Sequence, residues 1–545
     1  MKITSLLKSK LFAFLVLAFV IISVFWGITD TFYQQDEWNG LGLVFSKGVE
    51  SIFPGIFSPI DLLLVKGRIL SSLIFYFFAT LFPLQNMQLA ILAIALHATG
   101  AFLVFLLAKK LVNNTLLALV GAVFFAVNAV SHGAVTWPVI AISTVGSSIL
   151  VFASILSFFK FLESTRTKYL FLTGAMLYFS LWFKETGLYL FLLFPVAALF
   201  FKKYTFKSYI LHFWWFLLPF VLIVGYRIVE LRFGAPDPNL YISEASESFF
   251  LTILIRLVIY PLTSFSLMFV PGGFFIEFAR EVLRDNYKFF ANVPNDVLIA
   301  QTVILDLLAV ILTGVIVFFI ALFLKKETVV NKKSVLFWLL FTFLSFTPYV
   351  VLSKDFAYLE SRYYYLPVAG GAVLLSWIAK RIWDTLGKKL FLIIIFPFFL
   401  GLIVWHAISV GKAIDEQLIF SNWRKNFILD LKTLAPSLSC SKNVFYISGE
   451  KNYWSDGNIV PFQQGTGYTL MVLYNDSGRI PKELLAESYL FEIGSQGYKE
   501  VGEKGFGFFT NKEELDKVVE THKLQQDCII ALSYDSQRHK LIKND

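Results

Sequence analysis

The sequence predicts a polytopic α-helical membrane protein with about 11 transmembrane helices and a small C-terminal extracytoplasmic α/β domain. Hydrophobic residues make up 57% of the 545 residues and charged residues only 16%, against about 25% charged residues in ordinary globular domains. Apolar stretches recur from residue 11 to residue 409, with short clusters of lysine and arginine between them. The net charge of +9 therefore comes from loops that orient a membrane protein, and we expect no nucleic-acid partner.

A helix that crosses a membrane needs about 20 consecutive, mainly apolar residues. The first such stretch, 11–29, follows a short basic segment without a small-residue cleavage site. We interpret it as a retained span and not as a signal peptide. Eleven stretches in all are expected to span: 11–29, 87–108, 115–131, 138–159, 169–183, 186–201, 208–231, 297–324, 334–352, 363–380 and 389–409.

The basic clusters set the orientation of these spans. With the N-terminus inside, they all fall in inner loops, in agreement with the positive-inside rule. These clusters are Lys109/Lys110, Lys160/Arg166/Lys168, Lys202/Lys203/Lys207, Lys325/Lys326/Lys332/Lys333 and Lys380/Arg381/Lys388/Lys389. An odd number of spans then places the C-terminal region outside. We expect a multi-pass protein of the cytoplasmic (plasma) membrane.

Two further apolar stretches are predicted not to span. Residues 69–84 are short, and counting them would place every later basic cluster outside. We expect them to form an in-plane helix within a first outer loop, 30–86. Residues 249–290 are interrupted by charges and prolines. They are expected to form amphipathic helices on the outer surface, within an outer loop that covers residues 232–296.

The composition changes near residue 410, so residues 1–410 are predicted to be a transmembrane module and residues 411–545 an extracytoplasmic α/β domain. Short strands are expected at Asn443–Ser448 and Cys528–Tyr534, where β-branched and aromatic residues lie between turn residues. Helices are expected at Pro461–Tyr474 and at Asn511–Glu520, the second with Asn511 as its N-cap.

The chain has two cysteines, Cys440 and Cys528, and both lie in this C-terminal domain. An extracytoplasmic compartment permits a disulfide between them. Two buried free thiols are an equally good interpretation of the sequence. No spacing typical of a zinc site occurs.

Two adjacent carboxylates, Asp36 and Glu37, follow the first span directly, beside Trp38. Charge at a membrane boundary is costly, and it often marks a functional site. Taken alone, such acids more often only solvate the boundary. Together with outer-side cations, however, they would suit chemistry on a lipid-linked substrate at the membrane surface.

Other polar residues gather at the same predicted outer side: Arg68, His132, Lys184, Glu185, Arg362 and Tyr363. Each has a structural alternative. Arg68 could extend its stem along the membrane, His132 could cap a helix, Lys184 and Glu185 could form a local pair, and Arg362 could anchor the interface with its tyrosines. Their common placement favours an anionic lipid phosphate held beside a carboxylate base.

These stretches resemble the GT-C superfamily of membrane glycosyltransferases, most closely the protein O-mannosyltransferase-like branch that uses polyprenyl-phosphate sugars. The resemblance covers roughly residues 10–410. It rests on the acidic pair, the first outer loop and three short motifs: His132–Trp137, Lys184-Glu185-Thr186-Gly187 and Arg362–Pro367. The C-terminal region lacks the Trp-Trp-Asp signature of oligosaccharyltransferases, because Tyr453–Asp456 does not match it.

The resemblance implies an inverting transfer of a sugar from a polyprenyl-phosphate donor to a glycan, lipid or protein acceptor on the outer face of the membrane. Asp36 would be the catalytic base, with Glu37 in support. Arg362 would bind the phosphate, with contributions from Lys184, Glu185, Arg68, His132 and Tyr363. No cofactor is expected to be required, and a divalent metal is the alternative.

Three other functions stay open at this point. A lipid-linked polysaccharide polymerase or ligase would share the compartment and the carrier. A lipid-carrier transporter or flippase would need charges along a path through the spans, and often two related halves. No such halves are visible in the sequence. A non-catalytic scaffold would tolerate replacement of Asp36.

Overall fold

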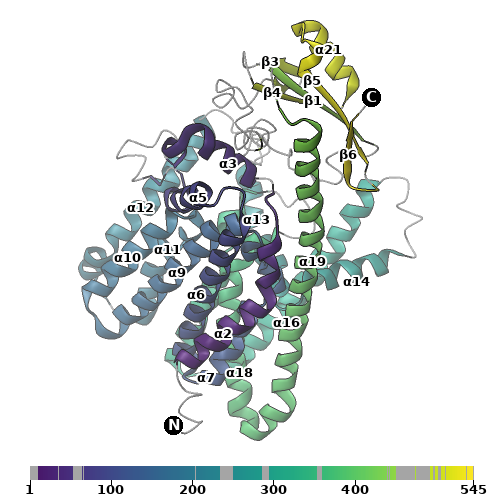
Figure 1. The fold of residues 1–545 in the computed structure, drawn as a ribbon. Coiled ribbons are helices and arrows are strands. Elements are labelled where there is room, and N and C mark those ends of the chain that lie inside the picture. Colours follow the sequence, from purple (N-terminus) through teal and green to yellow (C-terminus); the bar gives the residue numbers. More distant parts are fainter. Residues whose placement is uncertain are drawn as a thin grey trace. The chain divides into compact units, whose positions relative to one another are not determined.

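The computed structural model in Figure 1 describes most of the chain. The described residues are 10–34, 36–52, 64–65, 67–202, 204–233, 249–284, 294–352, 359–437, 440, 442–449, 473, 491–494, 497–500, 505–509, 511–535 and 537–543. The chain divides into two compact units. The first unit comprises residues 1–26, 56–71 and 90–412, and the second comprises residues 27–55, 72–89 and 413–545.

The first unit is built of helices. Its main helices are α2 (Lys10–Phe25), α6 (Asn86–Val112), α7 (Thr115–Ala126), α9 (Pro138–Ser164), α10 (Thr167–Leu181), α11 (Leu190–Phe201), α12 (Phe206–Phe233), α13 (Phe249–Ser264), α14 (Gly272–Arg284), α16 (Pro294–Lys325), α17 (Val329–Leu344), α18 (Tyr365–Leu390) and α19 (Phe396–Leu434). Two of them, α6 and α19, begin or end in the second unit.

Within the described chain, eight helical segments are long and apolar enough to cross a membrane, or nine if the bent pair Thr115–Ala126 and Ala129–Thr136 is one span. The eight are Lys10–Asp30, Asn86–Val112, Pro138–Ser164, Phe206–Val229, Leu251–Met268, Ala300–Lys325, Val329–Tyr349 and Ser361–Leu434. The lengths and compositions of these helices confirm the prediction of a polytopic helical protein.

The eight candidate segments differ from the eleven predicted spans in how two apolar regions are grouped. The stretch 169–201 forms α10 and the helix Glu185–Phe201, which is shorter than a full span, because the polar turn at Lys184 separates them. The predicted spans 363–380 and 389–409 lie in one helical run, Ser361–Leu434. That run is broken at Gly387, whose φ is 79°, and Figure 1 shows the chain turning back there between α18 and α19.

Within residues 249–284, one helical segment is longer and more apolar than the expected surface helices. The segment Leu251–Met268, which contains α13, is long and apolar enough to span. Its one arginine is satisfied inside the protein, since Arg256 Nη1 donates to the carbonyls of Val350 and Leu352 at 3.1 Å each. Such bonding lowers the cost of placing a cation in an apolar helix. Helix α14, with charged and apolar residues on opposite sides, keeps the amphipathic character that was predicted.

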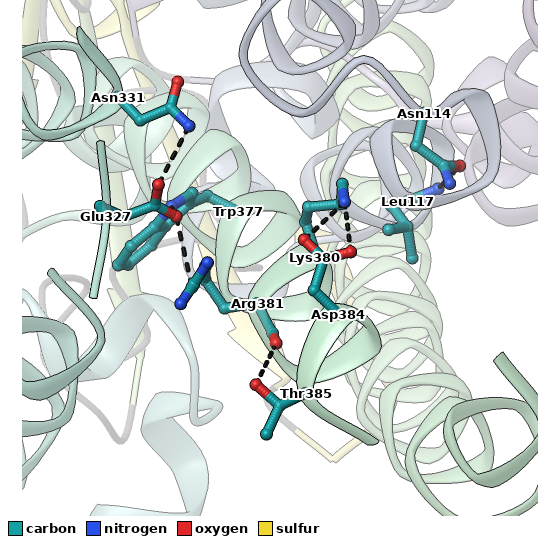
Figure 2. Close-up of polar contacts among 9 residues, drawn as sticks. All are labelled: Asn114, Leu117, Glu327, Asn331, Trp377, Lys380, Arg381, Asp384 and Thr385. Atoms are coloured by element: carbon teal, nitrogen blue, oxygen red, sulfur yellow. Dashed lines mark hydrogen bonds and ion pairs between the residues drawn. The ribbon is translucent and has the colours of Figure 1, made fainter. Parts of the chain in front are cut away.

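Close packing joins α7 to α18, and a buried carboxylate joins the turn between α16 and α17 to α18. A Cβ at Gly121 of α7 would lie 2.3 Å from the Ala372 carbonyl of α18, so the two backbones approach closely. In Figure 2, Glu327 accepts hydrogen bonds from Trp377 Nε1 and from Asn331 Nδ2, both at 3.0 Å, and pairs with Arg381 Nε at 3.3 Å. Glu327 therefore ties the turn between α16 and α17 to α18.

The second unit holds the short helices α3 (Asp36–Lys47) and η2 (Gly48–Ile52), most of α5 (Ile69–Leu81), and the C-terminal sheet. The predicted helix at 69–84 is thus confirmed as a short helix. A Cβ at Gly40 of α3 would lie 2.7 Å from the ring of Phe75 in α5, so these two helices pack tightly.

The C-terminal sheet has the strand order β4-β1-β5-β6. Strand β1 (Lys442–Gly449) runs parallel to β4 (Gly505–Phe509) and to β5 (Ile529–Asp535), and β6 (Lys540–Lys543) is antiparallel to β5. A separate pair, β2 (Phe491–Gly494) and β3 (Gly497–Glu500), is antiparallel. The small core of the sheet is formed by Val444, Phe509, Leu515 and Val518.

The predicted elements of this domain that fall in the described residues are confirmed. Strand β1 covers the predicted strand Asn443–Ser448, and β5 covers the predicted strand Cys528–Tyr534 except for Cys528. Helix α21 (Lys512–His522) begins after Asn511, whose side chain accepts from the Glu513 amide. Apart from Leu473, the predicted helix Pro461–Tyr474 lies outside the described residues. A disulfide joins Cys440 to Cys528, so the alternative of two free thiols is excluded.

Candidate functional site

The first unit brings together five of the predicted site residues: Arg68, Lys184, Glu185, Arg362 and Tyr363. They come from three places that are far apart in the sequence. The segment with Arg68 is held in place because the amide of Leu70 donates to the Trp182 carbonyl at 3.1 Å, at the end of α10. This backbone bond places Arg68 beside the turn that carries Lys184 and Glu185.

Glu185 pairs with two arginines. Its Oε2 lies 3.7 Å from Arg68 Nε, and its Oε1 lies 3.5 Å from Arg227 Nη2 of α12. The three side chains are 31–47% exposed, so each pair contributes at most about 1 kcal/mol to stability. These pairs bear on the site mainly through their geometry, because they bring two guanidinium groups to the two oxygens of one carboxylate.

Lys184 is buried, with 7% exposure. Its Nζ donates to Thr144 Oγ1 of α9 at 2.8 Å and lies 5.6 Å from the ring centroid of Tyr363. Burial lowers the pKa of Lys184 well below its ordinary value, and the charges of Arg68 and Arg362 lower it further. Glu185 and Glu360 act in the opposite direction. The two arginines are the larger of these four electrostatic effects, so the field of the neighbouring charges disfavours a positive charge on this amine.

Arg362 lies in the turn η7 (Ser361–Tyr364), directly before α18. Its Nε is 2.6 Å from Glu360 Oε2, and its guanidinium lies over the rings of Trp137 and Tyr363, at 5.3 and 5.2 Å from the centroids. Tyr363 in turn packs on Tyr349, with 4.4 Å between centroids. Aromatic faces on two sides restrict where this guanidinium can point.

The His132–Trp137 stretch forms a surface against which η7 packs. A Cβ at Gly133 would lie 2.0 Å from Ser361 Oγ and 3.4 Å from the amide nitrogen of Arg362, so only glycine fits without a shift. His132 itself bonds within its own turn, since its Nδ1 lies 3.2 Å from Thr136 Oγ1. His132 therefore lies in the segment that packs against the turn of Arg362, and its described hydrogen bond is to a residue of its own turn.

The acidic pair belongs to the second unit. Glu37 is 1% exposed, and its Oε2 accepts a hydrogen bond from the Gln34 amide at 2.6 Å. Burial and the nearby Glu37 carboxylate raise the pKa of Tyr33. Asp36 begins α3, and its side chain lies outside the described part of the chain. Glu37 therefore braces the start of α3, while Asp36 is the member of the pair whose role stays a prediction.

Four residues near these groups were not predicted: Thr144, Arg227, Tyr349 and Arg424. Arg227 and Arg424 had a signal, because each is a cation within a long helical pattern of apolar residues. Thr144 and Tyr349 had none, since a threonine in a span and a tyrosine at its end are common.

Among the described residues, no group of three or more His, Cys, Asp or Glu side chains could hold a metal ion.

Comparison with known proteins gives no match, either to a protein-family model or to a curated protein. The resemblance to the GT-C superfamily therefore rests on the motifs of this chain alone.

Proposed function

We propose that this protein is an inverting glycosyltransferase that moves a sugar from a polyprenyl-phosphate donor to an acceptor hydroxyl on the outer face of the membrane. The observation that carries the proposal is the gathering of Arg68, Lys184 and Arg362 in the first unit. Burial is the main cause that lowers the pKa of Lys184, and the charges of Arg68 and Arg362 lower it further, a combination that is common at functional sites.

The balance of charge supports a phosphate ligand. The described residues of this group include four cations, Arg68, Lys184, Arg227 and Arg362, but only two carboxylates, Glu185 and Glu360. The group keeps an excess of positive charge even when Lys184 is neutral. A phosphate bound there would gain charge-assisted hydrogen bonds from guanidinium groups whose directions are already restricted.

In the proposed reaction the acceptor oxygen attacks the anomeric carbon from the face opposite the phosphate. The Asp36 carboxylate takes the hydroxyl proton as the new carbon–oxygen bond forms. The bond from the anomeric carbon to the phosphate oxygen breaks, and its electron pair stays on that oxygen. The leaving polyprenyl phosphate gains one negative charge, which the cations would stabilise more strongly than they stabilise the donor.

The test is sugar transfer by the purified protein in lipid, from a panel of polyprenyl-phosphate monosaccharides. Asp36→Asn is expected to reduce turnover about 10²- to 10⁴-fold, the usual contribution of a general base. Glu50→Gln is the matched control, because it also converts a carboxylate of the same loop into an amide, at an exposed position. Full turnover in Asp36→Asn excludes Asp36 as the base, and no turnover of any donor by the wild type refutes the proposed function.

One observation bears on the transporter alternative, since discontinuous helices often line transport sites. The helix break between α7 and the following turn bends the chain by 41°. The polar groups at that break are bonded within the protein: Asn128 Nδ2 donates to the Met268 carbonyl at 2.8 Å, and the Ala129 amide donates to His406 Nδ1 at 3.0 Å. These bonds hold the break in place and favour a structural role for it.

A further inference from the structure

Helix α7 is interrupted after Ala126, and the chain resumes as a helical turn at Ala129. The bend between the two helical pieces is 41°. An interruption of this kind frees a carbonyl at the end of the first piece and an amide at the start of the second, and in apolar surroundings both need partners. Two buried histidines from other helices supply them, and the proposed reaction uses neither.

His97 of α6 bonds to the carbonyl at the end of the first piece. Its Nε2 lies 2.8 Å from the Ala126 oxygen, and its Nδ1 lies 2.8 Å from the Tyr365 hydroxyl. Because a carbonyl oxygen can only accept, Nε2 carries the hydrogen and donates it, which leaves Nδ1 to accept from Tyr365. His97 and Tyr365 are each 1% exposed, so loss of either bond leaves a buried polar group without that partner.

His406 of α19 bonds to the start of the second piece. Its Nδ1 accepts from the Ala129 amide at 3.0 Å, and its Nε2 lies 3.2 Å from the Phe269 carbonyl. Since Nδ1 accepts, Nε2 is the nitrogen that donates. The first piece of the interrupted helix is therefore tied to α6, and the second piece is tied to α19.

Through Tyr365, His97 also acts on the segment that carries Arg362. Tyr365 is the first residue of α18 and lies three positions after Arg362 of η7. Its ring packs on Phe125 with 5.0 Å between centroids. On α6, a Cβ added at Gly100 would lie 2.8 Å from the Tyr365 hydroxyl oxygen, so the hydroxyl fits closely against this helix. Helices α6 and α7 thus fix the start of α18, and with it the backbone of Arg362.

The second piece of the interrupted helix leads to the ring on which Arg362 packs. A Cβ at Gly133 would lie 3.4 Å from the Arg362 amide nitrogen, and the Arg362 guanidinium carbon lies 5.3 Å from the centroid of Trp137. His97 therefore bonds to both chain segments that place this guanidinium. Tyr365 sets the position of its backbone, and Ala126 lies at the bend that leads to Trp137.

We propose that His97 is a positioning residue for Arg362, and that its bonds to Tyr365 and Ala126 hold the guanidinium in the orientation that binds the phosphate of a polyprenyl carrier. This inference rests on the proposed function for the identity of the phosphate ligand. The bond between His97 and Tyr365 and its effect on the Arg362 segment can be tested without any sugar transfer.

The experiment uses two substitutions that remove the same hydrogen bond. Tyr365→Phe deletes only the hydroxyl, and His97→Gln keeps an amide donor for the Ala126 carbonyl while it removes the ring nitrogen that accepts from Tyr365. His212→Gln is the matched control, because His212 Nδ1 lies 2.7 Å from the Ser208 carbonyl of its own helix, α12.

Hydrogen–deuterium exchange of residues 360–366 is the first readout. It is expected to become about tenfold faster in Tyr365→Phe and in His97→Gln, and to stay unchanged in His212→Gln. The double variant His97→Gln/Tyr365→Phe is expected to exchange no faster than the single variants, because the second substitution has no further bond to remove.

Binding of a synthetic polyprenyl monophosphate to the purified protein in lipid is the second readout. The Kd is expected to rise about tenfold in Tyr365→Phe and in His97→Gln, since a misdirected guanidinium loses its charge-assisted bonds to the phosphate. The donor kcat/KM should fall by a similar factor while the acceptor KM stays unchanged. A variant that only folds less well lowers kcat through the amount of active protein and leaves the Kd of the folded protein as in the wild type.

The outcomes separate this inference from the proposed function. Unchanged exchange of residues 360–366 in both single variants overturns the link between His97 and the Arg362 segment. Faster exchange with an unchanged Kd overturns the positioning role. A wild type that binds the polyprenyl monophosphate but transfers no sugar, with weaker binding in both variants, supports the inference and refutes the proposed function. A wild type that does not bind the lipid phosphate overturns both.

Discussion

At the scale of single residues, Lys184 is the most informative side chain. Its burial, its hydrogen bond to Thr144 and the nearby Arg362 all act on one amine. The sequence indicated a charged residue between two short apolar stretches, but it gave no measure of burial. Burial is what converts an ordinary lysine into one that loses its proton easily, and it depends on packing by residues from other helices.

The lowered pKa of Lys184 predicts a change in the pH dependence of stability. Between the lowered pKa of the folded state and the ordinary pKa of the unfolded state, the unfolded chain binds more protons, so stability rises with pH in that window. Lys184→Met should abolish this contribution. Thermal unfolding of the purified protein measured from neutral to alkaline pH should show a smaller rise for Lys184→Met than for the wild type.

The control is Lys412→Met, which removes a lysine at an exposed position. It should leave the pH dependence as in the wild type. An equal rise with pH in Lys184→Met and in the wild type would show that Lys184 stays protonated in the folded state. The electrostatic support for an anion site would then be lost.

At the scale of elements, glycines decide how closely the helices approach. An added Cβ at Gly121 would lie 2.1 Å from Ser376 Oγ and 2.3 Å from the Ala372 carbonyl. The backbone oxygen cannot move away without moving α18, which begins directly after the turn that holds Arg362. The contact of α7 with α18 therefore bears on the site as well as on stability, as is common for small residues between membrane helices.

Gly121→Ala is therefore expected to destabilise the protein by about 1–3 kcal/mol through overpacking. Gly225→Ala is the control, because no atom lies within 4 Å of a Cβ added at this exposed position in α12. It should be neutral or slightly stabilising, given the better helix propensity of alanine. Thermal unfolding of the two variants side by side measures the difference, and equal midpoints would contradict close packing of α7 on α18.

At the scale of the whole molecule, the proposed chemistry depends on which side of the membrane each part occupies. The basic clusters predict that the turn with Lys332 is inside and that the C-terminal domain is outside. The disulfide between Cys440 and Cys528 agrees with an oxidising compartment for that domain. The orientation stays a prediction, and it can be measured directly.

Single cysteines introduced by Glu513→Cys and Lys332→Cys, in a background with both native cysteines replaced by alanine, provide the measurement. A membrane-impermeant maleimide applied to intact cells is expected to label the Glu513→Cys protein. It should label the Lys332→Cys protein only after permeabilisation. The reverse pattern would place the C-terminal domain inside and would remove the proposed reaction from the outer face.

The sequence by itself determined the helical membrane class, the polar C-terminal domain and the places where charge meets apolar segments. These features depend on local composition and on periodicity along the chain. It predicted eleven spans, whereas the described chain has eight candidate segments, one of which, Ser361–Leu434, contains two of the predicted spans. It also placed Leu251–Met268, which is a candidate span by its length and composition, on the outer surface, since it could not show that carbonyls of another segment satisfy Arg256.

Only the tertiary structure decided which charged residues meet. Glu185 pairs with Arg227, 42 positions later in the sequence. The disulfide was likewise undecided until the two cysteines were placed together. The physical reason is that a charge, a hydrogen bond or a thiol acts over a few ångströms in space. That distance is set by the packing of helices that are remote in sequence, and no local pattern contains it.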